Sequence, residues 1–208
     1  MKKSGVVYLG NSKFIALVRE NLIIVIFTLI FALGTLISTV FIGSESLKNL
    51  SEGFLDLFLK NRISVGFFSQ FLFSFVFSFI FIFSAFIFGT SLLGIAFVPF
   101  IIFSRGIFSG LLLAALYTDF GLIGIAVNLL SVLPGTIVCV LALINVSSDS
   151  MNLSYQIGKT VIGNGQNIYK FNITRLLKKY SLALIITAIG SLFEVILFNL
   201  FQNFFALG

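Results

Sequence analysis

The stretch of sequence that decides the fold is FFSQFLFSFVFSFIFIFSAFIF, at residues 67–88, and half of it is phenylalanine. From Phe71 to Phe83 every second residue is Phe, which is the side-chain period of a β-strand. The residues between them are Leu, Val, Ile and Ser, so no charged face alternates with the apolar one. A lone strand in lipid would leave its backbone groups unpaired, whereas a helix pairs them internally. We therefore predict a membrane-spanning helix over 65–90.

The composition of the whole chain also indicates an integral membrane protein. Of its 208 residues 59 % are hydrophobic and 10 % are charged, whereas soluble domains carry about 25 % charged residues. The sequence holds no His, which excludes a histidine general base, metal ligand or pH switch. Its single Cys139 excludes an intramolecular disulfide and a cysteine-cluster metal site. We therefore expect neither enzymatic activity nor a metal or other cofactor.

Outward from residues 67–88, further apolar runs predict four more spans. Each run is long enough, at 1.5 Å per residue, to cross a hydrocarbon core of about 30 Å. Pro99 and Pro134 lie inside two of these runs, and each should kink its helix because proline lacks a backbone donor. The run over 92–117 has two interpretations, one long kinked span or a broken, re-entrant pair. The predicted fold is all-α, a single polytopic transmembrane bundle of about five spans at 22–42, 65–90, 92–117, 120–144 and 180–205.

The positions of the charges predict the orientation of these spans. Lys and Arg concentrate in residues 1–21 and 145–179, and positively charged segments remain in the cytoplasm. We expect 1–21 to form a cytoplasmic interfacial helix and 145–179 to form a cytoplasmic loop. Five spans then place residues 43–64 and the C-terminus outside. The net charge of +6 is explained by these segments rather than by nucleic-acid binding, so the expected partners are the lipid bilayer and other membrane proteins.

Residues 43–64 carry acids and bases together with an apolar stripe. Leu50, Phe54, Leu57 and Phe58 recur at helical spacing opposite the charges. One interpretation is an amphipathic helix that packs on the outer interface. The other is a docking surface for an external partner, with Phe54 and Phe58 as its candidate contacts.

Arg105 and Glu194 are the two ionisable residues deep in predicted spans. A charge at membrane depth is rare and is usually paired or functional. Each lies about fourteen residues into its span, so we expect equal depth and a direct contact that ties the third span to the fifth. Snorkelling of Arg105 toward one interface is the competing interpretation. A third possibility is a small permease or transporter subunit whose pathway lies near the two charges.

Gly106 and Gly110 form a G-x-x-x-G motif beside Arg105. Small residues one turn apart allow the backbone of another helix to approach closely. We favour a helix of the same chain over a homodimer partner, and the last span is the neighbour that the contact of Arg105 with Glu194 would require.

Several short motifs are distributed from the second predicted span to the last. They are Leu93-Gly94-Ile95, Pro99, Arg105-Gly106 with Gly110, Asp119-Phe120-Gly121-Leu122-Ile123-Gly124, Leu133-Pro134 and Leu192-Phe193-Glu194. In this order they resemble the stage II sporulation protein M family, over roughly residues 65–205. One departure is Gly135, which stands where many members carry a polar residue after the Leu-Pro proline.

This resemblance implies a multi-pass protein of the bacterial cytoplasmic membrane without enzymatic activity of its own. The best-known members recruit a complex of peptidoglycan hydrolases, chiefly stage II sporulation proteins P and D, to the septum during engulfment. Other members occur in organisms that do not sporulate. The expected function is thus a membrane scaffold or anchor that recruits peptidoglycan-remodelling partners, and the alternative remains the small permease.

Overall fold

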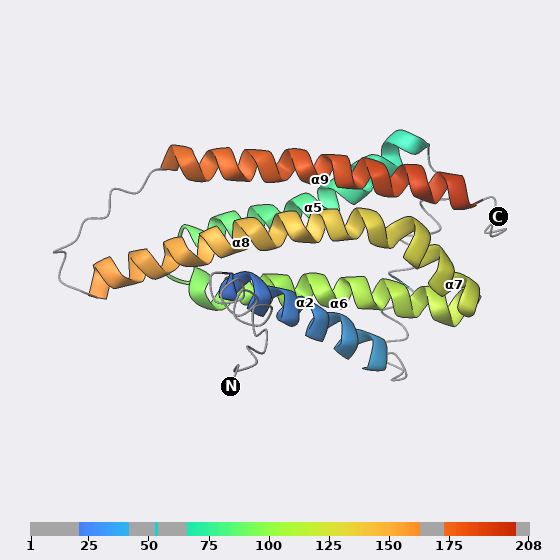
Figure 1. The fold of residues 1–208 in the computed structure, drawn as a ribbon, viewed down its shortest axis with the longest axis horizontal. Coiled ribbons are helices and arrows are strands. Elements are labelled where there is room, and N and C mark those ends of the chain that lie inside the picture. Colours follow the sequence, from blue (N-terminus) through green and yellow to red (C-terminus); the bar gives the residue numbers. More distant parts are fainter. Residues whose placement is uncertain (1–20, 42–52, 54–65, 163–172, 203–208) are drawn as a thin grey trace, which may run out of the picture.

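The computed structural model describes residues 21–41, 53, 66–162 and 173–202. Throughout these ranges the regular secondary structure is helical, and most of the helices run along one common axis (Figure 1). They are α2 (Leu22–Phe41), α5 (Phe67–Gly89), α6 (Gly94–Phe120), α7 (Leu122–Val127), the π-helical turn η2 (Asn128–Val132), α8 (Leu133–Ile162) and α9 (Ile173–Gln202).

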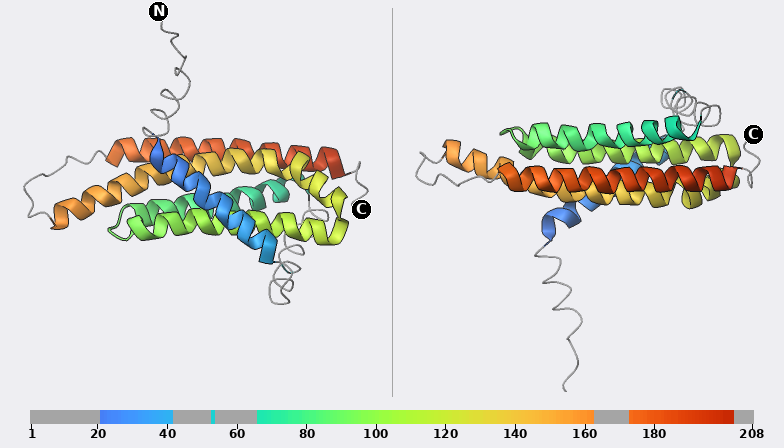
Figure 2. Two further views of the ribbon diagram at one scale, coloured as in Figure 1. Left: turned by 60° about the horizontal axis from the view of Figure 1, so that its bottom comes forward. Right: turned by 90° about the horizontal axis from the view of Figure 1, so that it is seen from above.

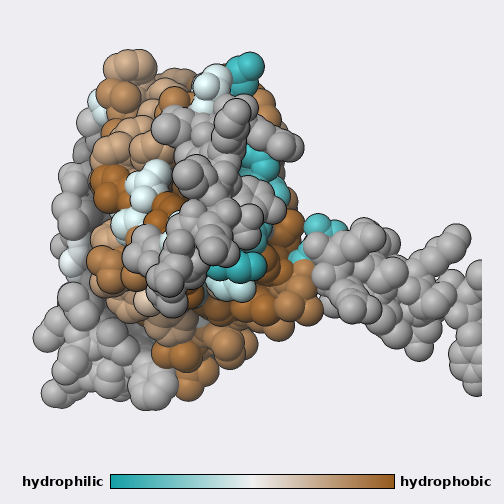
Figure 3. All heavy atoms as spheres, turned by 90° about the vertical axis from the view of Figure 1, so that its left-hand side faces the viewer, coloured by the Kyte–Doolittle hydropathy of each residue, from teal (hydrophilic) through white to brown (hydrophobic). Residues whose placement is uncertain are grey.

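Five of these segments are long and apolar enough to cross a membrane. They are Leu22–Val40, Phe67–Gly89, Gly94–Thr118, Leu122–Thr160 and Leu176–Phe201. Each exposes large hydrophobic side chains that would be unstable in water and suit a lipid environment. Figure 3 looks onto the end where α8 ends and α9 begins, with hydrophobic side chains on the flanks and hydrophilic ones gathered near the end. The predicted all-α bundle of five spans is therefore confirmed.

The helices form a four-membered core with α2 placed across it. α5 and α8 pack against each other, and each of them also packs on α6 and on α9. α2 lies obliquely over the outside of this core, mainly against α6 and to a smaller extent against α8 (Figure 2). The arrangement places α6 and α9 on either side of the α5–α8 pair.

The phenylalanine pattern of α5 has a helical solution. In a helix, an every-second-residue series divides into two series of four-residue spacing, on two different faces. One series places ring beside ring along the helix, with centroids 5.6–6.1 Å apart, at Phe71, Phe75, Phe79 and Phe83. In the other series Phe77 and Phe81 meet Phe108 of α6 edge to face. A third face, free of Phe, buries Gln70, Ser74 and Ser78, and the strand-like period thus produces a helix with separate aromatic and polar faces.

The two prolines have different effects. α6 continues through Pro99 as one helix, so the re-entrant interpretation of 92–117 is not adopted. Pro134 is the second residue of α8, and α8 directly follows the π-helical turn η2. Proline cannot donate to the carbonyl four residues earlier, and its ring collides with that group, so a wider turn before Pro134 relieves the conflict. Between α6 and α7 the chain reverses at Gly121, whose φ of 59° favours glycine.

The predicted cytoplasmic loop over 145–179 is wrong in its secondary structure. α8 continues to Ile162 and α9 begins at Ile173. The polar residues there are compatible with a helix because they bond within it, as Asn145 does to the carbonyl of Leu141. The interfacial segment 1–20 and most of 43–64, including Phe54 and Phe58, lie outside the described residues.

Candidate functional site

A cavity of about 390 Å³ lies inside the bundle. α2, α5, α6, η2, α8 and α9 all contribute to its wall, which is mostly apolar. The exposed members of the wall lie on two helices, Thr28 on α2 and Leu133, Ile137 and Leu141 on α8. The cavity therefore opens sideways between α2 and α8, on a surface that faces hydrocarbon in a membrane.

Arg105 lies near the middle of α6 and faces this cavity. Its side chain is 7 % exposed, and its guanidinium carbon lies 4.8 Å from the ring centre of Phe77 and 5.4 Å from that of Phe81. A cation over an aromatic face is attracted more strongly where water is excluded. The second phenylalanine series of α5 thus supplies the direct surroundings of the charge.

Glu194 of α9 reaches the same cavity and is 3 % exposed. Its Oε2 accepts a hydrogen bond from the Ser74 hydroxyl at 2.8 Å. Nearby along the same two helices, the amide of Asn199 donates to Gln70 Oε1 at 2.7 Å. These two interactions join the polar face of α5 to α9, and a hydrogen bond to an ionised carboxylate is stronger than one between neutral groups.

Arg105 and Glu194 share the cavity but do not form the direct ion pair that the sequence predicts. In the part of the chain that the structure describes, no carboxylate lies within ion-pair distance of the Arg105 guanidinium. Along α5, Glu194 is level with Ser74, whereas Arg105 is level with Phe77 and Phe81. This offset is one to two helical turns, or about 5–10 Å.

Two features of the fold explain the offset. α9 begins at Ile173 instead of residue 180, so counting residues from the predicted ends misplaced Glu194 along the axis. In addition, α5 and α8 lie between α6 and α9, so residues of the third and fifth spans meet only across the interior.

Gly106 and Gly110 admit a different helix from the expected one. Their neighbour is α2, because a Cβ added at Gly106 would lie 3.2 Å from Gly34 Cα and would collide with the carbonyl oxygen of Phe31. At Gly110 an added Cβ would collide with Ser38. The predicted contact within the chain is confirmed, and the expectation that the last span occupies it is wrong.

The last helix instead approaches at Gly135, directly after Pro134. A Cβ added at Gly135 would lie 2.5 Å from Glu194 Cβ and 2.7 Å from the carbonyl oxygen of Gly190. A larger side chain at this position would therefore push α9 away and move Glu194 out of the cavity. The glycine at this position therefore has a packing reason in this chain.

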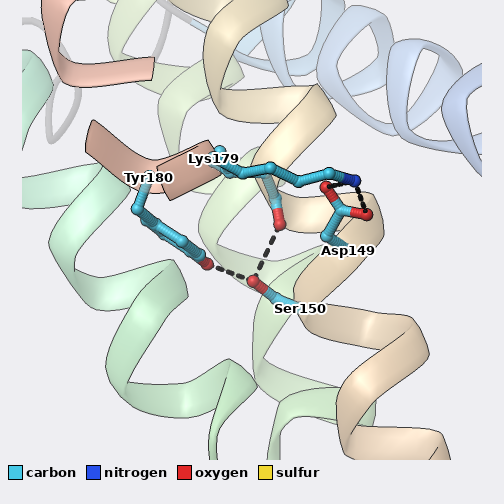
Figure 4. Close-up of polar contacts among 5 residues, drawn as sticks. Asp149, Ser150, Lys179 and Tyr180 are labelled. Atoms are coloured by element: carbon cyan, nitrogen blue, oxygen red, sulfur yellow. Dashed lines mark hydrogen bonds and ion pairs between the residues drawn. The ribbon is translucent and has the colours of Figure 1, made fainter. Parts of the chain in front are cut away.

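A second polar site joins the middle of α8 to the first turns of α9, and we call Asp149, Ser150, Lys179 and Tyr180 the α8–α9 clamp (Figure 4). Lys179 Nζ lies 2.6 Å and 2.7 Å from the two carboxylate oxygens of Asp149. The hydroxyls of Ser150 and Tyr180 hydrogen-bond beside them, and Ser150 also donates to the carbonyl of Val146. The ion pair is half-exposed, whereas the hydroxyl pair is buried.

The sequence did not reveal the clamp, because three of its four residues, Asp149, Ser150 and Lys179, lie in the predicted loop over 145–179, whereas Tyr180 begins the last predicted span. A usable signal was present, since an acid beside a hydroxyl at Asp149-Ser150 matches a base beside a hydroxyl at Lys179-Tyr180. Gln70 was missed as well, although it precedes Ser74 at the same four-residue spacing that separates Ser74 from Ser78.

Comparisons with protein-family models, with curated proteins and with solved structures give no match for this chain. The resemblance to the stage II sporulation protein M family therefore rests on the short motifs alone. Any functional conclusion depends on the geometry of the two polar sites and on the membrane-spanning fold.

Proposed function

We propose that this chain is a non-enzymatic membrane scaffold, similar to stage II sporulation protein M, that holds peptidoglycan-remodelling partners at the bacterial cytoplasmic membrane. The observation that supports this most directly is where the motif residues lie. Gly94 packs against Ser154, Gly106 against Gly34, and Gly110 against Ser38. Residues that carry the resemblance thus occupy close helix contacts, as expected for a scaffold that must keep its shape.

Polar surface at one end of the bundle is consistent with this role. α8 continues for two turns beyond Ser154, whose hydroxyl binds the carbonyls of Ser91 and Leu92 at the α5–α6 turn. On this extension Tyr155 and Lys159 are exposed. Under the charge-based orientation this end is cytoplasmic, and the stripe with Phe54 and Phe58 remains the proposed outer docking surface, for a partner that acts at the septum during engulfment.

The scaffold role is tested by recovering the tagged full chain from native membranes after mild cross-linking. We expect peptidoglycan hydrolase activity, detected by zymography, to co-elute with the protein. The double variant Phe54→Ser with Phe58→Ser should lose this activity, whereas the lipid-facing control Phe100→Ser, at a side chain that is 61 % exposed, should retain it. Absence of hydrolase activity from the wild-type eluate, with the protein intact, would reject the proposal.

The cavity favours a second candidate function, a small permease or transporter subunit. Arg105 and Glu194 line it from opposite sides of the α5–α8 pair, and intramembrane charges often mark substrate or ion paths. A permease is stabilised by its solute and transports that solute into liposomes. A scaffold shows no solute flux, so a flux assay on the purified chain separates the two functions.

A further inference from the structure

We infer that the cavity between α2 and α8 binds an anionic single-chain amphiphile from the bilayer, with its carboxylate or phosphate head on Arg105 and its tail leaving past Ile137 and Leu141. This inference does not depend on the scaffold role, because a ligand site of this kind can exist in a scaffold or in a permease.

The first argument is the unfilled hydrogen-bonding capacity of Arg105. A guanidinium carries five N–H donors, and the described contacts of this one are the faces of Phe77 and Phe81. Among the described residues no oxygen accepts a hydrogen bond from it. A buried charge without hydrogen-bond acceptors is costly, and planar carboxylate and phosphate groups match the guanidinium in bidentate geometry.

The carboxylate of Glu194 does not supply these acceptors. It is level with Ser74, one to two turns of α5 away from the rings beside Arg105. Its negative charge nevertheless lies in the same cavity and repels a second anion. Glu194 therefore makes the site selective for a head with low negative charge.

The second argument is the route into the cavity. Its exposed wall residues, Thr28, Leu133, Ile137 and Leu141, lie on α2 and α8 inside segments that are long and apolar enough to span a membrane. A ligand that enters between them comes from hydrocarbon, so it must carry an apolar tail. The volume of about 390 Å³ lies within the range of about 300–1,000 Å³ for ligand pockets, which are mostly apolar with a few polar groups.

The shape of the wall supports a chain-like tail. Val132, Thr136, Val140 and Ile144 follow one another at four-residue spacing along one face of the fourth span. This face covers about 18 Å along the helix axis. A single acyl or prenyl chain can lie along such a face, whereas a compact solute would contact only part of it.

The test uses the absence of tryptophan from the chain. Ile137→Trp places one fluorophore at the mouth of the cavity, and Ile189→Trp places one on a lipid-facing part of α9 that is 60 % exposed. The probe is stearate brominated in mid-chain, which quenches tryptophan on contact, added to the full chain in phosphatidylcholine nanodiscs. We expect saturable quenching at position 137 and only unsaturable, lipid-like quenching at position 189.

The head group is tested with matched ligands and variants. Stearyl alcohol with the same bromination should bind at least about tenfold more weakly than the carboxylate, because it lacks the charge that pairs with Arg105. Arg105→Gln in the Ile137→Trp background should abolish this preference. Glu194→Gln should tighten binding of the carboxylate, while Lys159→Gln, which removes a distant positive charge, should leave it unchanged.

Several results would overturn the inference. Equal quenching at positions 137 and 189, or equal affinity for the acid and the alcohol, would reject a specific anionic site. Displacement of the probe by acetate or inorganic phosphate at similar concentration would assign the site to a free anion. If Arg105→Gln does not fold, as judged by circular dichroism and gel filtration, the acid–alcohol comparison in the folded Ile137→Trp protein decides alone.

Discussion

The two polar sites of the bundle place opposite charges in different surroundings. In the α8–α9 clamp, Lys179 and Asp149 are 45 % and 33 % exposed and are in direct contact. In the cavity, Arg105 and Glu194 are 7 % and 3 % exposed and do not pair directly. Water weakens the attraction between exposed charges. The free energy of a buried charge instead depends strongly on the groups packed around it. Direct contact is therefore a poor guide to which pair matters more for stability, and the predictions below test this conclusion.

The largest effect should come from the cavity charges. We expect Arg105→Leu and Glu194→Leu each to lower the free energy of unfolding in detergent micelles by about 3–5 kcal/mol, because each change leaves the opposite charge buried. The loss in the double variant should be smaller than the sum of the two single losses by about 1–2 kcal/mol, since the two charges share a cavity. Thermal and denaturant unfolding of the four proteins, followed by circular dichroism, measures this coupling.

The clamp provides the matched control for this cycle. Asp149→Leu and Lys179→Leu, alone and together, should give a coupling below about 1 kcal/mol despite the shorter distance, because the pair is half-exposed. A coupling in the clamp that equals or exceeds the coupling in the cavity would contradict the ranking of the two sites.

A smaller effect is expected from the hydroxyl that binds Glu194. Ser74→Ala removes a charge-assisted hydrogen bond at a residue that is 4 % exposed and should cost about 1.5–3 kcal/mol. Ser84→Ala is the matched control, because it makes the same chemical change on a half-buried part of the same helix. Equal losses of stability in the two variants would show that the contact with Glu194 contributes nothing specific.

The fold could be predicted largely from the sequence because lipid leaves few alternatives. A long apolar run in hydrocarbon must be helical, and this constraint outweighed the strand-like period of the phenylalanines in α5. The ends of the helices were harder to predict. Polar residues beyond 145 were interpreted as a loop, but side chains such as Asn145 and Ser150 bond to the preceding turn of their own helix.

The residues of the candidate site could be predicted from the sequence, but the distances between them could not. Arg105 and Glu194 are unusual residues for a membrane span, and the four-residue spacing of Gly106 and Gly110 indicates a helix contact, so the local sequence identifies all four. Their distances depend on how α6 and α9 are shifted along their axes, and these helices do not follow one another in the chain. Nothing local in the sequence fixes that shift, nor does it reveal that α2 occupies the groove at Gly106.

The buried half of the clamp should contribute about 1 kcal/mol. Tyr180→Phe removes the hydroxyl bonded to Ser150 and keeps the ring that meets Phe86 edge to face with centroids 4.9 Å apart. Ser150 still donates to the carbonyl of Val146, which limits the loss to roughly that of one neutral hydrogen bond. Tyr155→Phe, at a side chain that is 62 % exposed, should leave the unfolding temperature unchanged. A larger effect at Tyr155 would contradict this assignment.

The smallest effect should come from the exposed half of the clamp. Reversing one charge with Asp149→Lys or Lys179→Asp replaces an attraction by a repulsion, yet each should cost only about 0.5–1 kcal/mol because the side chains are partly exposed. Combining both reversals restores the opposite charges and should recover most of the loss. These differences in unfolding free energy should also shrink between 0.05 M and 0.5 M salt, because added salt shortens the distance over which exposed charges interact. The cavity variants provide the contrast, since buried charges are screened much less and their coupling should remain nearly constant over the same salt range. If the clamp differences persist in high salt while the cavity coupling disappears, water reaches Arg105 and Glu194 more freely than their burial indicates.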